Sequence, residues 1–443
     1  MSDKQKVFEP SKELPVIKDV DVVVCGGGPS GFIAAIAAAR NGAKTLLLET
    51  YGFLGGMATA GMVGPISKFN FNGERIIGGI PNEFISHMYA RGGAIVDLPS
   101  GNIPYDPEVY KYVSQQMVLD AGVEILFHTQ AVDCICSGER PTKVTHVIIE
   151  NKSGRQAIAT KYVIDCTGTG DVMARTPLPW EIRGREDGEL QPMTLYFRLG
   201  GVDTDAVNLL MAHDNMKYAN AELRNYLQKS LEQGELGNFG GPWALHGSTI
   251  RKGEVSVNAT RISGNAAIGK ELSDAAINLR EDVFTIIKIF KENSDAFKNC
   301  YLIDTAPQVG IRETRTIVGE YTMTTEDILT PRAFSDTVAK GGHPVDVHRA
   351  GTSQQDVRFI EAPYDICFRS LIPKGSVNVL VGGGCIAATR QAFASIRVQA
   401  QCMALGQAAG TATALCAKMN NAAIGELDGS VLRKVLAEQG AIV

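Results

Sequence analysis

The chain has 443 residues, of which 47 are glycine and 44% are hydrophobic, with a formal net charge of −5. Its glycine share exceeds the roughly 7% usual in proteins, but glycine does not recur at every third residue, and the apolar content is too high for a disordered chain. No long basic block suits a nucleic-acid backbone, and no run of 18 apolar residues suits a membrane span. We expect a globular protein of two or three domains.

The cysteines and histidines indicate a reducing compartment and no metal site. The nine cysteines are scattered without a Cys-x-x-Cys pair, so we expect buried free thiols. Residues 1–19 lack the apolar region of a secretory signal or membrane anchor, which predicts a cytoplasmic protein. No metal is expected, because five histidines lack ligand spacing: His87, His128, His146, His213 and His246.

The first part of the chain predicts a strand–helix–strand unit followed by a β-meander. An apolar strand at 21–25 leads through a glycine cluster to an alanine-rich helix at 32–40, and a leucine-rich strand follows at 44–48. A helix and four further strands are then expected at 108–121, 123–127, 131–136, 145–150 and 156–165.

The pattern changes at Glu181 and returns near Gly375. Between them we expect a strand near 193–199 and helices around 205–233 and 273–292. After Gly375 a strand at 377–381 is followed by three glycines and one long helix from about 394 to 418. The first kind of domain therefore resumes near the end of the chain.

The glycine cluster between the first strand and helix has the spacing G-x-G-x-x-G. Gly26 permits a tight turn, Gly28 lets the backbone approach a pyrophosphate, and Gly31 lets helix and strand pack closely. Pro29 and Ser30 begin the helix, whose N-terminus attracts phosphate. Glu49 ends the second strand, where a carboxylate binds a ribose hydroxyl. A dinucleotide site is predicted; the alternative is an ordinary glycine-rich turn with a solvated Glu49.

Further motifs favour FAD over NAD. Glycines directly after the second strand allow a long cofactor to approach the backbone again, and the strand ending in Cys166-Thr167-Gly168 resembles one that returns to the cofactor in two-part FAD domains. The alternative is a plain turn at the end of a strand. Besides the fingerprint and Glu49, the predicted FAD contacts are Gly55, Gly56, Met57, Thr59, Val132, Thr167 and Gly168.

A second motif, Gly382-Gly383-Gly384-Cys385-Ile386-Ala387, satisfies G-x-G-x-x-A and suggests a separate NAD domain. Only one long helix follows it, and no second strand ends in an acidic residue at the required distance. We therefore predict a close flavin contact at Gly384. The next helix would point its positive end at the flavin, with Ser395 and Ile396 as contacts.

Together these elements predict an α/β fold. A Rossmann-like FAD-binding domain, with a parallel sheet, helices and a β-meander, would comprise residues 20–180 and 372–430. An inserted α+β substrate or cap domain would comprise residues 181–371.

Several blocks resemble a known family. The fingerprint with Glu49, the Ile-Asp-Cys-Thr-Gly strand and later blocks are similar to the bacterial FAD-dependent oxidoreductases of the glutathione-reductase-like flavoproteins; the later blocks are 258–261, 306–320, 346–348 and 368–374. The resemblance implies FAD, a cap domain over its isoalloxazine and a distant relation to the fumarate reductase flavoprotein. Where such families commonly have Ala-Gly-Arg, this chain has Gly383-Gly384-Cys385, so an arginine is missing, and Arg390 is the candidate to replace it.

Charged residues of the cap are the candidate catalytic groups. Arg312 and Arg315 stand three apart, so one can point inward and clamp a substrate carboxylate; the alternative is a structural ion-pair network. Asp346 precedes His348 by two residues, so on a strand both face one way and the carboxylate could orient the imidazole as a base. The alternative is a surface histidine.

The expected function is an FAD-dependent oxidoreductase that transfers a hydride between a small polar, anionic organic substrate and flavin N5. The alternatives are a fumarate-reductase-like reductase, a flavin monooxygenase, and a non-catalytic FAD-binding sensor. We expect no nucleic-acid or membrane partner, while the oligomeric state, including a homo-oligomer, stays open.

Overall fold

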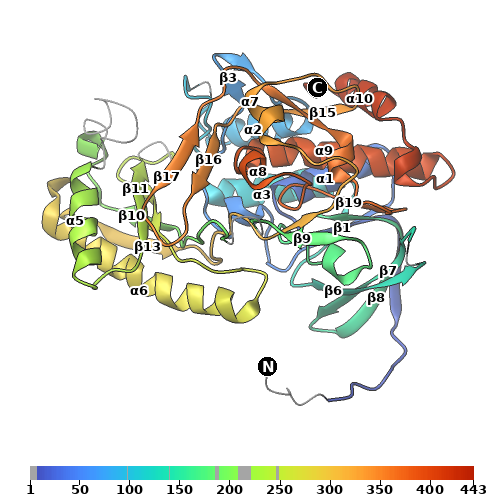
Figure 1. The fold of residues 1–443 in the computed structure, drawn as a ribbon, viewed down its shortest axis with the longest axis horizontal. Helices are drawn as coiled ribbons and strands as arrows, with labels where there is room; N and C mark the ends of the chain where they lie inside the picture. Colours follow the sequence, from blue (N-terminus) through green and yellow to red (C-terminus); the bar gives the residue numbers. More distant parts are fainter. Residues whose placement is uncertain (1–6, 97, 139, 185–188, 208–220, 246–248) are drawn as a thin grey trace.

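The computed structural model describes residues 7–96, 98–138, 140–184, 189–207, 221–245 and 249–443. Two sheets with separate hydrophobic cores organise it, and they lie on opposite sides of the view in Figure 1. Two of the histidines discussed above, His213 and His246, lie outside the described residues.

The larger sheet has the strand order β5-β2-β1-β8-β7-β6, with β19 also paired to β8. Its parallel strands are β1 (Val16–Cys25), β2 (Thr45–Leu48), β5 (Glu124–Leu126), β8 (Gly154–Asp165) and β19 (Val379–Val381). The antiparallel meander adds β6 (Gln130–Ser137) and β7 (Lys143–Asn151). The start of β8 pairs with β7 and its end with β19, so the sequence-distant last strand enters the same sheet. The predicted α/β class and Rossmann-like core with a meander are confirmed.

Two helices cross closely on this sheet. They are α1 (Pro29–Arg40) and α9 (Gln399–Lys418), both rich in alanine and largely buried. A Cβ added to Gly406 would lie 2.1 Å from the Ser30 carbonyl oxygen, and one at Gly410 would lie 2.1 Å from that of Ala34. Only glycine allows this approach, which packs the first half of α1 against the middle of α9. The remaining helices of this part are α2 (Gly79–Ala90), α3 (Pro107–Asp120) and α10 (Gly429–Glu438).

The prediction of one continuous helix over 394–418 is wrong. The chain forms α8 (Arg390–Ile396), leaves the helical conformation at Val398 with φ −73° and ψ 155°, and begins α9 at Gln399. No glycine or proline marks the break, so the sequence pattern does not reveal it. Arg397, which stands directly before α9, contacts Asp346, a residue far away in the sequence.

The smaller sheet is antiparallel, in the order β11-β12-β10-β13. It comprises β10 (Phe197–Gly200), β11 (Phe239–Leu245), β12 (Val255–Thr260) and β13 (Tyr301–Thr305), with α5 (Ala221–Glu232) and α6 (Gly269–Asn293) beside it. Helix α6 buries Leu279, Val283 and Phe290 in the core that Phe197 and Val257 also form. This part corresponds to the expected insertion.

Four two-stranded sheets complete the fold: β9 (Trp180–Ile182) with β14 (Arg315–Ile317), β15 (Thr337–Gly341) with β18 (Tyr364–Cys367), β16 (Val345–His348) with β17 (Gln355–Arg358), and β3 (Asn70–Phe71) with β4 (Glu74–Arg75). The short α7 covers Thr325–Leu329. Met323, Phe334 and Ile366 belong to the larger core. These residues lie within the segment 181–371, and the division into domains stays a prediction.

In the part of the chain that the structure describes, no helix is both long and apolar enough to cross a membrane. All nine cysteines lie in that part, and all are free thiols.

Candidate functional site

The start of α1 offers backbone amides to an anion. Gly28 precedes the helix with extended dihedral angles and no side-chain cap, and Pro29 and Ser30 form its first residues. The first amides of a helix have no acceptor within it and carry the positive end of its dipole. A Cβ at Gly31 would lie 1.8 Å from the Gly26 carbonyl oxygen, so the turn tolerates no side chain there. This geometry fits a pyrophosphate.

Glu49 lies beside this turn. Its carboxylate is buried and accepts hydrogen bonds from the Gly27 amide at 2.7 Å and the Tyr51 amide at 2.9 Å. Burial raises the pKa of Glu49, and the backbone amides oppose this shift. A carboxylate has about four acceptor sites, so the group can also accept a ribose hydroxyl.

The loop after β2 connects the beginnings of α1 and α9. A Cβ at Gly56 would approach the Gly28 Cα to 2.7 Å, which places the two glycines in contact. Farther along, the Val63 carbonyl accepts from the Tyr105 hydroxyl at 2.8 Å and from Gln399 Nε2 at 2.5 Å. A long cofactor can therefore follow one continuous stretch of backbone from the fingerprint to α9. Of the other predicted contacts in this loop, Thr59 is buried and donates to the Leu54 carbonyl at 2.7 Å, while Met57 is half-buried.

The ends of β8 and β19 meet beside the same turn. A Cβ at Gly384 would lie 2.5 Å from the Gly168 carbonyl oxygen, so these glycines are close neighbours. Thr167 donates from its amide and its hydroxyl to the buried Asp165, at 3.0 and 2.7 Å. Val132 lies where the pairing of β6 with β7 shifts register, so its backbone leaves the regular ladder.

Two predicted cofactor contacts do not fit the structure. Ser395 and Ile396 are both fully buried among protein atoms, and the Ser395 hydroxyl lies 2.6 Å from that of Tyr364 while also donating to the His343 carbonyl. The expectation assumed that both belong to the helix pointing at the flavin. The break at Val398 moves that helix start, so Arg397 and Val398, both partly exposed, stand directly before it.

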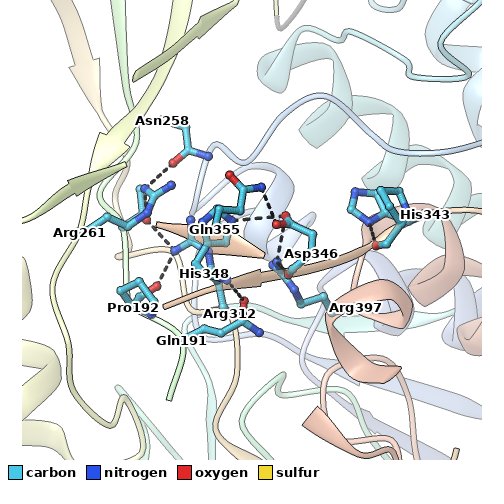
Figure 2. A network of polar contacts seen from close by, with 12 residues as sticks. Gln191, Pro192, Asn258, Arg261, Arg312, His343, Asp346, His348, Gln355 and Arg397 are labelled. Atoms are coloured by element: carbon cyan, nitrogen blue, oxygen red, sulfur yellow. Dashed lines mark hydrogen bonds and ion pairs between the residues drawn. The ribbon is translucent and has the colours of Figure 1, made fainter. Parts of the chain in front are cut away.

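A cluster of buried arginines lies where the two parts of the molecule meet (Figure 2). Arg312 donates from Nη1 to the Pro192 carbonyl at 2.5 Å and to Thr194 Oγ1 at 2.7 Å. Arg261 follows β12 and donates from Nη1 to the same Thr194 hydroxyl at 2.9 Å and to Asn258 Oδ1 at 2.7 Å. Thr194 therefore holds two guanidinium groups side by side.

The β16–β17 hairpin supplies the other side of the cluster. His348 Nε2 lies 3.3 Å from Asp346 Oδ2, and Arg397 Nη2 lies 3.6 Å from the same oxygen. Gln355 Nε2 donates to Asp346 Oδ1 at 2.5 Å, and the His348 amide donates to Gln191 Oε1 at 3.2 Å. The expected juxtaposition of Asp346 and His348 is present, and His348 is buried rather than exposed.

Charge and burial shift the pKa values of both histidines and of Asp346. Burial, then the neighbouring Arg312, lowers the pKa of His348 to about 3, although Asp346 opposes the shift. Burial also lowers the pKa of His343 to about 4. The pKa of Asp346 falls well below its usual range although burial opposes this, because His348 and Arg397 stabilise the carboxylate. Near neutral pH the cluster therefore holds neutral histidines, one carboxylate and three guanidinium groups.

The other predicted arginines lie elsewhere. Arg315 donates to the Thr169 carbonyl at 2.9 Å and to Asp171 at 2.8 Å. Arg390 pairs through Nε with the buried Glu313 at 3.1 Å and lines a separate cavity of about 260 Å³. The contact of Arg315 matches the structural ion-pair alternative, and the role of Arg390 near the glycine triplet stays a prediction. That loop is held by buried Arg183, which donates to the carbonyls of Gly384, Ile386 and Ala388.

A larger cavity lies next to the cluster. Its volume is about 560 Å³, and its lining includes residues within two positions of members of the cluster: Leu190, Ser263 and Ala350. Arg261 itself is 2% exposed, whereas Asp346 and Arg397 retain 16% and 17% of their side-chain surface. The Asp346–Arg397 edge is therefore the more exposed side of the cluster.

Sequence reasoning missed Arg261, Arg397 and Thr194. Asn258-Ala-Thr-Arg261 was noticed only as part of a family-like block, and its arginine had no nearby acidic residue to draw attention to it. Arg397 was hidden inside a helix predicted to be continuous. Arg261 and Arg397 each stand beside apolar residues in the sequence. This position could have identified them, because an arginine in an apolar segment needs a buried partner.

Comparison with known proteins identifies the family. The family model described as "FAD dependent oxidoreductase" matches residues 21–436, nearly the whole chain. The chain belongs to this family. The cofactor is FAD, as the uncapped α1 N-terminus, the glycine contacts and Glu49 allow.

Curated relatives of this FAD-dependent oxidoreductase match over part of its length. A leghemoglobin reductase from Vigna unguiculata is 30% identical over 238 residues, 48% of this chain and 43% of that protein. Dihydrolipoyl dehydrogenase 1 of Arabidopsis thaliana is 28% identical over 48% of this chain and 44% of its own length. The chain thus spans less than half the length of these relatives, which add weak homology to glutathione-reductase-like flavoproteins.

Two solved structures are similar to this chain at low identity. A geranylgeranyl bacteriochlorophyll reductase-like protein from Thermoplasma acidophilum is 14% identical, with a TM-score of 0.44 over 96% of this chain and 84% of that one. The myxobacterial chondrochloren halogenase is 12% identical, with a TM-score of 0.47 over 94% and 78% of the two chains.

Proposed function

We propose that this chain transfers a hydride between a small polar, anionic organic substrate and N5 of FAD. The observation that carries the proposal is the buried arginine cluster, whose Arg261 and Arg312 share the Thr194 hydroxyl beside His348. Bound FAD supplies the two-electron chemistry, and the protein must bind and orient the substrate and move its proton.

The residues of the cluster suit these tasks. Arg261 and Arg312 bind the substrate anion, since a guanidinium offers paired donors that match a carboxylate. If His348 donates its Nε2 hydrogen to Asp346, its Nδ1 is free to accept a proton from a substrate hydroxyl or amine. Because burial lowers the pKa of His348 to about 3, the imidazole is neutral near pH 7 and keeps a lone pair that can accept a proton.

The charge expected from Arg390 is better assigned to Arg397. Arg397 directly precedes α9, whose N-terminus lies near the end of the glycine loop: a Cβ at Gly383 would approach Cys402 Sγ, in the first turn of α9, to 3.4 Å. A cation and a helix N-terminus at one place favour negative charge there. We also propose that the protein is cytoplasmic, which suits its nine free thiols.

The first experiment is anaerobic reduction of the purified holoprotein. A flavin spectrum with bands near about 370 and 450 nm should bleach with some member of a panel of small hydroxy acids, amino acids and other carboxylates. Bleaching by dithionite but by no member of the panel would contradict the dehydrogenase direction. Consumption of an enoate by the pre-reduced protein would then favour the fumarate-reductase-like alternative, and oxygen-dependent product formation with NADPH would favour a monooxygenase.

A further inference from the structure

The arginine cluster has two ends (Figure 2). At one end Arg261 and Arg312 are held together by Thr194. At the other end Arg397, which comes from the start of α9, lies against Asp346. His348 stands between them, because it contacts Asp346 and lies close enough to Arg312 and Arg261 for both to lower its pKa. The two ends come from segments far apart in the sequence.

Each end retains a donor without an acceptor. Among the described residues, Arg261 Nη2 and Arg397 Nε are buried atoms that have no hydrogen-bond partner. The contact of Arg397 with Asp346 is also loose, at 3.6 Å. A buried guanidinium N–H without a partner is costly, and such atoms commonly mark the place of a missing ligand. One unpaired donor at each end indicates two acceptor groups rather than one.

The net charge of the cluster also indicates two acceptor groups. Arg261, Arg312 and Arg397 contribute three positive charges, and Asp346 is the one carboxylate among the described groups that act electrostatically on Arg312. His343 and His348 are neutral near pH 7. Two positive charges are therefore uncompensated at a largely buried place, which is unfavourable until two negative charges enter.

We propose that the cluster binds a small dicarboxylate, with one carboxylate at Arg261 and Arg312 and the other at Arg397. The carbon chain would then pass His348, the residue placed to exchange a proton with it. A phosphate monoester carries both charges on one group and does not reach both ends. The inference rests on the proposed function for its choice of site and names the class of substrate.

The test is calorimetric titration of the oxidised, FAD-loaded protein with matched ligands. Malonate, succinate, glutarate and adipate are compared with their monoamides and with ethyl phosphate, which carries its charge on one group. We expect at least one dicarboxylate to bind about 10- to 100-fold more tightly than its monoamide, the usual worth of a hydrogen bond to a charged group. Equal affinity for a dicarboxylate and its monoamide would overturn the proposal, as would tighter binding of ethyl phosphate than of any dicarboxylate.

Two variants locate the two carboxylates. Arg261→Gln and Arg397→Gln should each reduce the ratio of dicarboxylate to monoamide affinity towards one, while the flavin spectrum and melting temperature confirm folded holoprotein. Arg349→Gln is the matched control, because this exposed arginine next to His348 pairs with Asp356; its ratio should stay at the wild-type value. An unchanged ratio in Arg261→Gln contradicts the proposal. If either variant fails to fold, the wild-type comparison alone decides.

This experiment separates the inference from the proposed function. Titration of the oxidised protein requires no turnover, so a dicarboxylate preference stands even if no compound reduces the flavin. Conversely, reduction of the flavin by a monocarboxylate that binds as tightly as every dicarboxylate would support the proposed function and overturn the inference.

Discussion

The nucleotide end and the arginine cluster recognise negative charge in different ways. The nucleotide end is the glycine turn and the start of α1, where backbone amides attract the anion within the continuous segment from Gly26 to Gly31. In the cluster, side chains from five separate segments meet, and buried guanidinium groups supply the charge. A backbone site depends on local sequence, whereas the cluster depends on the whole fold. The two should therefore respond differently to substitution.

The largest effect is expected at the nucleotide end. In Gly31→Val the new Cβ would lie 1.8 Å from the Gly26 carbonyl oxygen, a backbone atom that cannot move away. We expect a loss of at least about 3 kcal/mol of unfolding free energy and no bound FAD. Absorbance and thermal melting measure both. Gly425→Ala is the control, since its Cβ meets nothing within 4 Å; normal FAD content in Gly31→Val would contradict the assigned turn.

Substitution of the proposed base should leave the nucleotide end intact. His348→Gln removes the group that accepts the substrate proton, so anaerobic flavin reduction should slow about 10²- to 10⁴-fold with full FAD content. Stopped-flow absorbance gives the rate. His146→Gln, on the β-meander strand β7, makes the same change far away and should retain the wild-type rate. A wild-type rate in His348→Gln removes this residue from the mechanism.

Loss of one cluster arginine should weaken substrate binding. Arg312→Gln leaves Arg261 alone on Thr194, and truncating one partner of a buried charge contact costs about 2–5 kcal/mol. The substrate concentration for half-maximal flavin reduction should rise at least about 30-fold. The FAD content should not change, because the fingerprint is separate. An effect on FAD retention rather than on substrate concentration would mean that the two regions are not independent.

The pH dependence of stability tests the arginine cluster without any substrate. The pKa of His343 lies at about 4 and that of His348 at about 3, below the usual value of 6.5. The unfolded chain therefore takes up protons below about pH 6.5 while the folded chain does not. The stability contributed by the neutral histidines is complete above that pH and is lost as the pH falls towards 4. Each histidine should contribute about 1.4 kcal/mol per pH unit.

Chemical denaturation between pH 7 and pH 4.5 measures this slope. The double variant His343→Gln with His348→Gln should lose less stability per pH unit than the wild type. An equally steep decline in the double variant would show that other groups cause it.

The contrast between the regions also explains what the sequence could predict. The first strand–helix–strand unit, the meander and Glu49 follow from local periodicity and from glycines whose backbone conformation is needed nearby. The break at Val398 and the position of Arg397 depend on contacts with the β16–β17 hairpin, which no local pattern encodes. Arg312 and His348 were found because each had a charged neighbour in sequence. Arg261 was missed because its partners, Thr194 above all, are distant.

The most direct test of anion binding by the arginine cluster is anaerobic flavin reduction with one substrate in its charged and uncharged forms. Once a carboxylate that bleaches the flavin is found, its neutral amide is compared with it in wild type and in Arg261→Gln. If the arginine cluster binds the substrate anion, the wild type should react far faster with the carboxylate, and Arg261→Gln should lose most of this preference. Equal rates for both forms in the wild type would contradict an arginine cluster that binds the substrate anion.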